Sequence, residues 1–120
     1  MSLRKLFFES KSNKYLKNFL NYEKKELSDI IEVHNRPRYI NKLHKYNKNL
    51  VLYYHNDPLS LKGSKTINDR INLIKKTKKI IFISRWVKKR FLIGLDIKKM
   101  PINQFEIIQH CTKKKKLNFK

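Results

Sequence analysis

Short apolar runs alternate along this chain with stretches of helical periodicity. Ile30, Ile31 and Val33 form one apolar run, and Ile80-Ile81-Phe82-Ile83 forms another. Short runs rich in β-branched and aromatic residues are typical of buried strands, whereas apolar positions three or four residues apart indicate helices. Strands are therefore expected at residues 29–34, 49–54, 79–84 and 105–109, and helices at residues 1–27, 38–46, from 66 or 68 onward, and from 85 to about 93.

Residues that commonly end helices support these boundaries. Thr66 or Asn68 can cap the third helix, whose isoleucines, beginning with Ile67, are expected to face inward. Ser84 can cap the fourth helix, and Gly94 suits the position just after its end. A polar loop is expected between the second strand and the third helix.

The order of these elements predicts an α/β fold. Alternating helices and strands require right-handed crossovers and give a parallel sheet. The nearly continuous apolar run at residues 30–33 indicates a strand that is covered on both faces. We therefore expect a Rossmann-like parallel sheet of about four strands with helices on both faces. With 120 residues, the chain is expected to hold one domain at residues 1–112 and a basic tail at residues 113–120.

The charge of the chain changes this picture only modestly. The net charge is +21, which favours nucleic acid, anionic lipid or phosphorylated partners. However, lysines far outnumber arginines, and no aromatic residues interleave the lysine runs to form a base-stacking platform. Nucleic acid is therefore an unfavoured partner. No signal peptide or membrane-spanning run is visible, so a cytoplasmic protein is expected.

Three predicted strand ends carry the candidate chemistry. Two of them repeat one pattern, His34-Asn35-Arg36-Pro37 and His55-Asn56-Asp57-Pro58, and the third reads Ser84-Arg85-Trp86. Because the carboxyl ends of parallel strands meet at one edge, these side chains should line one crevice. Imidazole, carboxylate and guanidinium groups together suit a hydroxyl-rich or phosphorylated ligand.

Structural roles compete with this interpretation. Asn35 and Ser84 are good helix caps, and Asp57 before a proline is a common turn former. The repetition at successive strand ends nevertheless favours a site. The adjacent His110 and Cys111 have no second pair at metal-binding spacing, so no metal is expected. Glycine-rich dinucleotide and P-loop motifs are absent from the sequence, and no cofactor is predicted.

Residues 29–95 resemble a known enzyme family. The blocks that carry the likeness are residues 30–37, His55-Asn56-Asp57-Pro58-Leu59 with Lys62-Gly63-Ser64-Lys65, Arg70, and residues 80–91 with Gly94-Leu95. These blocks are similar to the acceptor-side domain of retaining, nucleotide-sugar-dependent glycosyltransferases of family 4. Within that family, the likeness is to bacterial members that build lipopolysaccharide and surface polysaccharide.

The resemblance implies a GT-B architecture, in which two Rossmann-like domains face each other across a cleft. It places His55 at the reaction centre, as the candidate catalytic residue. A larger set of residues is implied to form the acceptor side: His34, Asn35, Arg36, Asn56, Asp57, Lys62, Gly63, Ser84 and Arg85. The implied co-substrate is a nucleotide sugar, and the implied acceptor is a saccharide or a lipid-linked saccharide.

The chain also departs from the family pattern. It is expected to begin with a helix in place of the first βα unit and to lack the donor-binding domain of the family. The chain is thus expected to be a fragment or half of a two-part enzyme, inactive alone, with a partner chain that carries the donor domain. Peripheral contact with the anionic inner membrane would suit a lipid-linked acceptor. The alternative is a small basic protein that binds nucleic acid or an anionic membrane surface.

Overall fold

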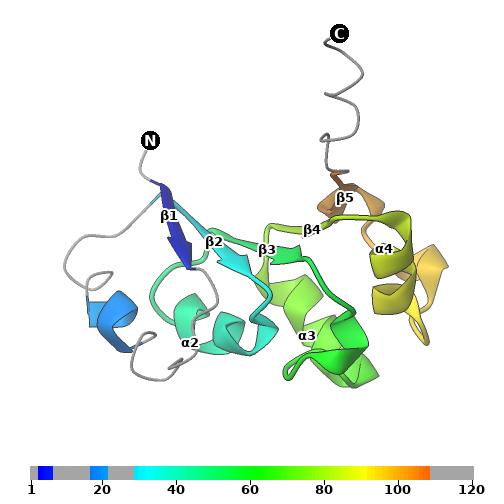
Figure 1. Ribbon diagram of the computed structural model, residues 1–120, viewed down its shortest axis with the longest axis horizontal. Coiled ribbons are helices and arrows are strands. Elements are labelled where there is room, and N and C mark those ends of the chain that lie inside the picture. The colour runs from blue at the N-terminus through cyan, green and yellow to red at the C-terminus, as the bar shows by residue number, and fades with distance from the viewer. Residues whose placement is uncertain (1–2, 7–16, 22–28, 109–120) are drawn as a thin grey trace, which may run out of the picture.

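The computed structural model describes residues 3–6, 17–21 and 29–108, which form a parallel sheet with helices packed against it (Figure 1). Each strand pairs with the next strand in the chain, in the order β1-β2-β3-β4-β5, and all four pairings are parallel. The strands are β1 (Leu3–Leu6), β2 (Ile30–His34), β3 (Leu50–Tyr54), β4 (Lys79–Phe82) and β5 (Phe105–Ile107). The α/β class and the Rossmann-like parallel sheet are confirmed.

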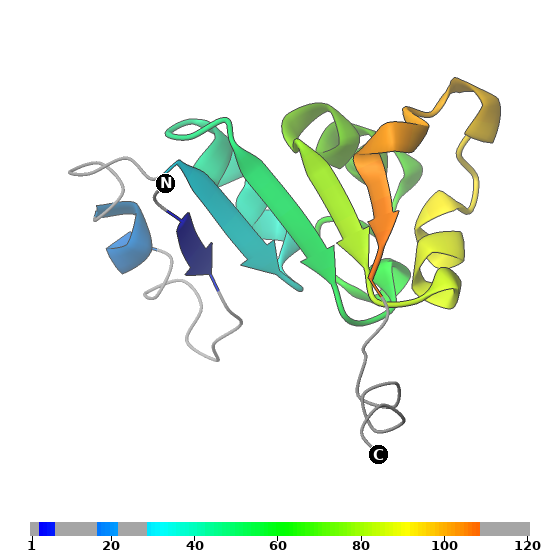
Figure 2. The same ribbon diagram turned by 90° about the horizontal axis from the view of Figure 1, so that it is seen from above.

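The helices of the described segments lie on one face of the sheet (Figures 1 and 2). Besides the helical residues 17–21, they are α2 (Ile40–His44), α3 (Ile67–Lys76) and α4 (Arg85–Leu92). Single 3-10 turns are η1 (Pro37–Tyr39), η2 (Pro58–Ser60), η3 (Ile97–Lys99) and η4 (Ile102–Gln104). Helices on both faces were expected from the sequence. When parallel strands pair in chain order, right-handed crossovers place every connection on the same side. The strand order, which the sequence pattern does not reveal, accounts for this difference.

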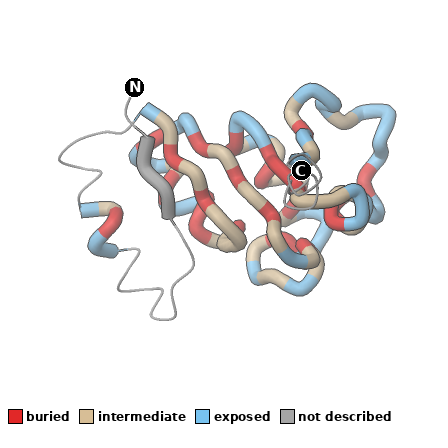
Figure 3. The backbone as a smooth tube through the Cα atoms, turned by 45° about the horizontal axis from the view of Figure 1, so that its top comes forward, coloured by how far each residue is buried: buried red, intermediate tan, exposed pale blue. Residues whose placement is uncertain are grey.

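Burial alternates along the central strands, as Figure 3 shows in red and tan. In β3, Leu50, Leu52 and Tyr54 point into the core beneath the helices, whereas Val51 and Tyr53 lie on the opposite face and are partly exposed. The core joins these side chains to others from α2, α4 and β5, including a group of stacked and tilted aromatic rings. The sheet therefore presents a second, more polar face that carries half of the strand side chains.

The N-terminal prediction is corrected in part. Leu3–Leu6 is a strand that pairs with β2, so the first described element is a strand where a helix was expected. This strand has only four residues, two of them charged, and its pattern is too short to show strand periodicity. Residues 17–21 are helical as expected, and Phe19 is buried in the core. The remainder of residues 1–27, His110, Cys111 and the tail at 113–120 lie outside the described residues.

The predicted helix caps are confirmed. The Thr66 hydroxyl accepts a hydrogen bond from the Asp69 N–H at 3.0 Å, and the Ser84 hydroxyl accepts one from the Val87 N–H at 3.2 Å. Gly94 follows α4 with a φ of 83°. Ile67, in contrast, is 44% exposed, which contradicts its predicted inward orientation.

Arg70 of α3 is a charged residue that is buried beside the core. Its side chain is buried, and Nη1 donates to the carbonyl oxygens of Phe91 and Ile93, both at 2.7 Å. These carbonyls lie at the carboxyl end of α4, where helix carbonyls lack partners within the helix. Arg70 thus connects α3 to the end of α4. This structural role accounts for an arginine at this position of the family-like blocks.

Candidate functional site

The ends of β2, β3 and β4 lie side by side at one edge of the sheet. His34 is in register with Tyr53, and Tyr54 is in register with Phe82. The residues that follow, at 35–37, 55–58 and 83–86, therefore leave the sheet at the same edge, as the sequence predicted. The details differ, however, because the structure brings some of these side chains together and keeps others apart.

Two histidines at this edge form a hydrogen-bonded pair. The His34 Nδ1 and His55 Nε2 atoms are 2.9 Å apart, and the two rings are stacked with centroids 5.2 Å apart. On its other side, His34 Nε2 lies 3.3 Å from Glu32 Oε1. The Tyr53 ring stacks on His34, with centroids 4.4 Å apart, and its hydroxyl donates to Glu32 Oε2 at 3.4 Å. We refer to Glu32, His34, Tyr53 and His55 as the histidine cluster.

The carboxylate sets the direction of these hydrogen bonds. An ionised Glu32 can only accept, so His34 carries its proton on Nε2 and offers Nδ1 as an acceptor. His55 must then donate from Nε2, which leaves its Nδ1 as the basic nitrogen. Burial and the charge of Glu32 raise the pKa of Tyr53, so the phenol remains a donor. The cluster therefore holds the His55 ring in one tautomer and one orientation.

Asn35 connects the two strand ends. Its side-chain oxygen accepts hydrogen bonds from the backbone N–H groups of His55, at 2.8 Å, and Asn56, at 3.3 Å. Its amide nitrogen donates to the Asn56 side-chain oxygen at 2.9 Å. Asn35 has a φ of 56°, in the left-handed region that asparagine tolerates better than most residues. The amide of Asn35 thus fixes the backbone that carries His55, while Asn56 itself is exposed.

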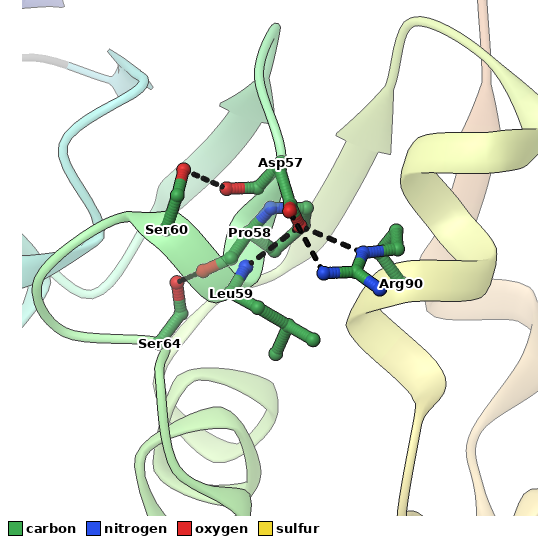
Figure 4. Close-up of polar contacts among 6 residues, drawn as sticks. All are labelled: Asp57, Pro58, Leu59, Ser60, Ser64 and Arg90. Atoms are coloured by element: carbon green, nitrogen blue, oxygen red, sulfur yellow. Dashed lines mark hydrogen bonds and ion pairs between the residues drawn. The ribbon is translucent and has the colours of Figure 1, made fainter.

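Asp57 has a structural role at this edge. Its carboxylate accepts from the Leu59 N–H at 3.0 Å and from Arg90 of α4, through Nε at 3.1 Å and Nη2 at 2.9 Å (Figure 4). The Arg90 guanidinium lowers the pKa of Asp57, and the Leu59 N–H lowers it further, against an opposing contribution from burial. Asp57 therefore anchors the loop after β3 to α4. The Asp57 carboxylate, which was expected to face the acceptor, is paired with Arg90.

Ser84 and Arg85 have other surroundings than the histidine cluster. Ser84 caps α4 with its hydroxyl, as the structural alternative had indicated. Arg85 is exposed and lines a different groove, of about 480 Å³, with Lys88, Lys89, Leu92 and Ile107. The structure thus shows no contact between these residues and His34 or His55 within the described segments.

A polar pocket of about 260 Å³ lies beside the cluster, between the end of β2 and the loop after β3. It is lined by Asn35, Arg36, Arg38, Ser60, Leu61 and Lys62. Three of the predicted site residues, Asn35, Arg36 and Lys62, meet here. Gly63 serves the backbone instead, because it has a φ of 97° and a Cβ there would lie 2.6 Å from the Arg38 nitrogen.

The sequence interpretation missed several residues that matter here. Glu32 and Tyr53 each precede a predicted histidine by two positions, and side chains two apart share a face of a strand. This periodicity could have identified them. Arg38 lies in η1 and Arg90 lies in α4, outside the strand ends that the repeated pattern identifies. That pattern therefore did not predict that they would lie near the site.

Other proteins offer no further guidance on this site. No family model, curated protein or solved structure matches this chain. Among the described residues, no cluster of histidine, cysteine or acidic side chains is suited to hold a metal ion. Within the same segments, no helix is both long and apolar enough to cross a membrane.

Proposed function

We propose that this chain is the acceptor-side part of a glycosyltransferase, which transfers a sugar from a nucleotide-sugar donor to a saccharide or lipid-linked acceptor. The observation that carries the proposal is the His34–His55 pair, with nitrogens 2.9 Å apart and Glu32 behind it, at the carboxyl edge of a parallel sheet. That edge is where open α/β sheets bind their ligands. The resemblance to family 4 glycosyltransferases adds support, because it places His55 at the reaction centre.

In the proposed reaction, the bond between the sugar C1 and the nucleoside diphosphate breaks and a bond from C1 to an acceptor oxygen forms. The acceptor hydroxyl gives up its proton, which the leaving diphosphate takes. His55 orients the sugar hydroxyls beside the reacting carbon by accepting a hydrogen bond at Nδ1. His34 and Glu32 act through His55 and are positioning residues, since they fix its tautomer and ring plane.

The remaining predicted residues have different roles under this proposal. Asn56, Arg36 and Lys62 face the acceptor side and contact the acceptor directly. Asn35, Asp57 and Gly63 hold the loops that carry them, through the contacts described above. Ser84, which caps α4, and Arg85, which lines the groove beside α4, have no part in this site under the proposal. The nucleotide-binding residues are supplied by a donor domain, either in the same protein or in a partner chain.

The proposal is tested by measuring sugar transfer with this chain joined to, or mixed with, a donor-binding domain of a family 4 enzyme. His55→Ala should lower the transfer rate by about a hundredfold, which is typical for the loss of a group that positions the substrate at the reaction centre. His44→Ala, which changes a histidine on α2 away from the edge, is the matched control. Transfer by the His55→Ala protein at the rate of the control would refute the assignment.

A second function is favoured by one surface. The groove that carries Arg85, Lys88 and Lys89 also exposes the apolar atoms of Leu92 and Ile107, and Trp86 beside it is 56% exposed. Basic and aromatic side chains on one surface are typical of proteins that bind anionic membranes peripherally. This surface supports contact with the cytoplasmic face of the inner membrane, which is compatible with a lipid-linked acceptor.

Trp86 makes this second function measurable, because it is the only tryptophan of the chain. Its fluorescence should shift to shorter wavelength when vesicles that contain phosphatidylglycerol are added, and neutral phosphatidylcholine vesicles should give no shift. Lys88→Glu with Lys89→Glu should weaken the effect, whereas Lys98→Glu with Lys99→Glu on η3 changes the same charge elsewhere. An equal response to both double variants would show that general charge, and no particular surface, binds the lipid.

A further inference from the structure

The pocket beside the histidine cluster concentrates positive charge. Its six lining residues comprise three cations, two neutral polar side chains and one leucine: Arg36, Arg38, Lys62, Asn35, Ser60 and Leu61. We refer to it as the arginine pocket. Its volume of about 260 Å³ is large enough for a small anionic group with part of the molecule that carries it.

The two arginines are close enough to affect each other. Burial and the positive charge of Arg38 lower the pKa of Arg36, against an opposing contribution from Tyr39. Both guanidinium groups stay charged at neutral pH because arginine does not lose its proton in proteins. Arg36 also donates from Nη1 to the Asn35 carbonyl oxygen at 3.0 Å, and the positive charges of both arginines attract an anion to this pocket.

The walls of the arginine pocket are fixed before any ligand arrives. The Gly63 backbone packs so tightly on Pro37 and Arg38 that a Cβ would collide with both. The Ser64 hydroxyl donates to the Pro58 carbonyl, and the Ser60 hydroxyl donates to the Asp57 carbonyl at 2.8 Å. Asp57 is in turn held by Arg90, as Figure 4 shows. A preorganised wall reduces the entropy lost on binding.

We propose that the arginine pocket binds a phosphate group carried by the acceptor. A phosphate dianion offers three oxygens and more charge than a carboxylate, which suits two guanidinium forks and an ammonium group. Asn35 lines the arginine pocket and also accepts from the His55 N–H, so a phosphate bound there would place the attached sugar near His55. That the bound phosphate belongs to the sugar acceptor rests on the proposed function. That the pocket binds a phosphate group does not.

Titration calorimetry of the full chain with two matched sugars tests this inference. Glucose 6-phosphate and glucuronate carry their anion on the same carbon, and we expect the phosphate to bind at least about tenfold more tightly. Inorganic phosphate should compete with glucose 6-phosphate. Vesicles that contain phosphatidic acid show whether a lipid phosphate reaches the same site, since such vesicles should then also displace the sugar phosphate.

Charge variants locate the binding. Arg36→Gln and Arg38→Gln should each weaken glucose 6-phosphate binding by about tenfold or more, as expected for the loss of a hydrogen-bonded charge. Lys62→Gln should weaken it less, and Lys98→Gln, another exposed lysine, should leave it unchanged. Because Lys62 is exposed, its variant tests the pocket even if an arginine variant fails to fold. Equal binding by the Lys62 and Lys98 variants, or equal affinity for glucuronate, would overturn the inference.

The two proposals fail separately. His55→Ala should abolish transfer and retain glucose 6-phosphate binding, because His55 does not line the arginine pocket. If His55→Ala retains transfer while the arginine variants lose binding, the proposed function fails and the phosphate site stands. If His55→Ala loses transfer while the arginine variants bind normally, the phosphate site fails alone.

Discussion

His34 and His55 lie 21 residues apart in the chain, yet their Nδ1 and Nε2 atoms are 2.9 Å apart at the ends of neighbouring strands. Their rings are nearly parallel, with an angle of 16° between the planes. Glu32 contacts the far nitrogen of His34 at 3.3 Å, so a carboxylate and two imidazoles form one chain of hydrogen bonds. Glu32 therefore influences the orientation of His55 through His34.

Glu32→Gln should disturb this chain of hydrogen bonds without removing its atoms. A carboxamide can donate as well as accept, so it no longer requires the proton of His34 to sit on Nε2. We expect the imidazole ¹⁵N signals of both histidines to show a mixture of tautomers, and sugar transfer to fall by about tenfold. Transfer should fall through kcat more than through KM, because orientation at the reacting carbon is affected.

Glu106→Gln is the matched control for this variant. Glu106 lies on the same face of the sheet, in register with Ile81, which is itself in register with Tyr53. Besides burial and Glu32, its charge contributes to the raised pKa of Tyr53, but its carboxylate accepts a hydrogen bond from Lys79 at 3.1 Å. Its replacement should leave the imidazole signals unchanged. If Glu32→Gln and Glu106→Gln give the same spectra and rates, the carboxylate does not set the tautomer of His55.

The repeated pattern at the two strand ends predicted that His34 and His55 lie close together. Parallel strands and short connections require both ends to lie at one edge, whatever the details of packing. The role of Asp57 was less predictable, because its partner Arg90 lies 33 residues further along the chain. From the sequence alone, the Asp57 carboxylate could bind a substrate or form an ion pair. Only the folded structure shows that Arg90 lies beside it.

Fold prediction succeeded where periodicity was strong and failed where it was short. The cores of β2, β3 and β4 were expected from continuous apolar runs, and Ile40 and Leu43 of α2 are buried as expected. The strand Leu3–Leu6 was missed because it is stabilised by pairing with β2 and carries too few residues to show a period. Ile67 was misplaced because it is the first residue of α3, where it remains 44% exposed, although Arg70 three residues further along the same face is buried.

Asn35→Ala should destabilise the fold by about 3 kcal/mol, through the loss of hydrogen bonds to the His55 and Asn56 N–H groups and the strain of alanine at a positive φ. Asn35→Gly removes the same hydrogen bonds but tolerates the φ of 56°. The glycine variant should therefore be more stable than the alanine variant by about 1 kcal/mol. Urea unfolding measures both, and equal stability of the two variants would exclude backbone strain at this position.

The ion pair between Asp57 and Arg90 should make stability depend on pH under acidic conditions. Arg90 lowers the pKa of Asp57 below its ordinary value of 3.8, so the folded state binds this proton less readily than the unfolded state. The stabilisation is therefore complete at pH values well above 3.8 and is lost as pH falls through the lowered pKa of the folded state. Asp57→Asn should remove this contribution, because an amide caps the turn but cannot ionise.

Urea unfolding at neutral and acidic pH measures this effect. The wild-type protein should be more stable than Asp57→Asn at neutral pH, and the difference should shrink steadily on acidification. Arg90→Gln should show the same loss, and the double variant should be little worse than either single variant. A difference between wild type and Asp57→Asn that stays constant across this pH range would show that the carboxylate charge contributes nothing.

Gly63 and Gly94 form a natural pair for testing the wall of the arginine pocket. Both have positive φ values, of 97° and 83°, so alanine at either position carries a similar backbone cost of about 1–2 kcal/mol. Their surroundings differ. A Cβ on Gly63 would lie 2.6 Å from the Arg38 backbone nitrogen, whereas a Cβ on Gly94 would meet the end of the Ile67 side chain at 2.7 Å. A side chain can rotate away from such a contact, and a backbone held in a turn cannot.

We therefore expect Gly63→Ala to lower the free energy of unfolding by clearly more than Gly94→Ala, by about 1–3 kcal/mol beyond the shared backbone cost. The displaced turn also carries Arg38, so glucose 6-phosphate binding should weaken in Gly63→Ala and stay unchanged in Gly94→Ala. Urea unfolding and calorimetry of the two variants measure these effects. If both alanine variants are equally stable and bind equally well, the close packing of Gly63 on η1 neither stabilises the loop nor shapes the arginine pocket.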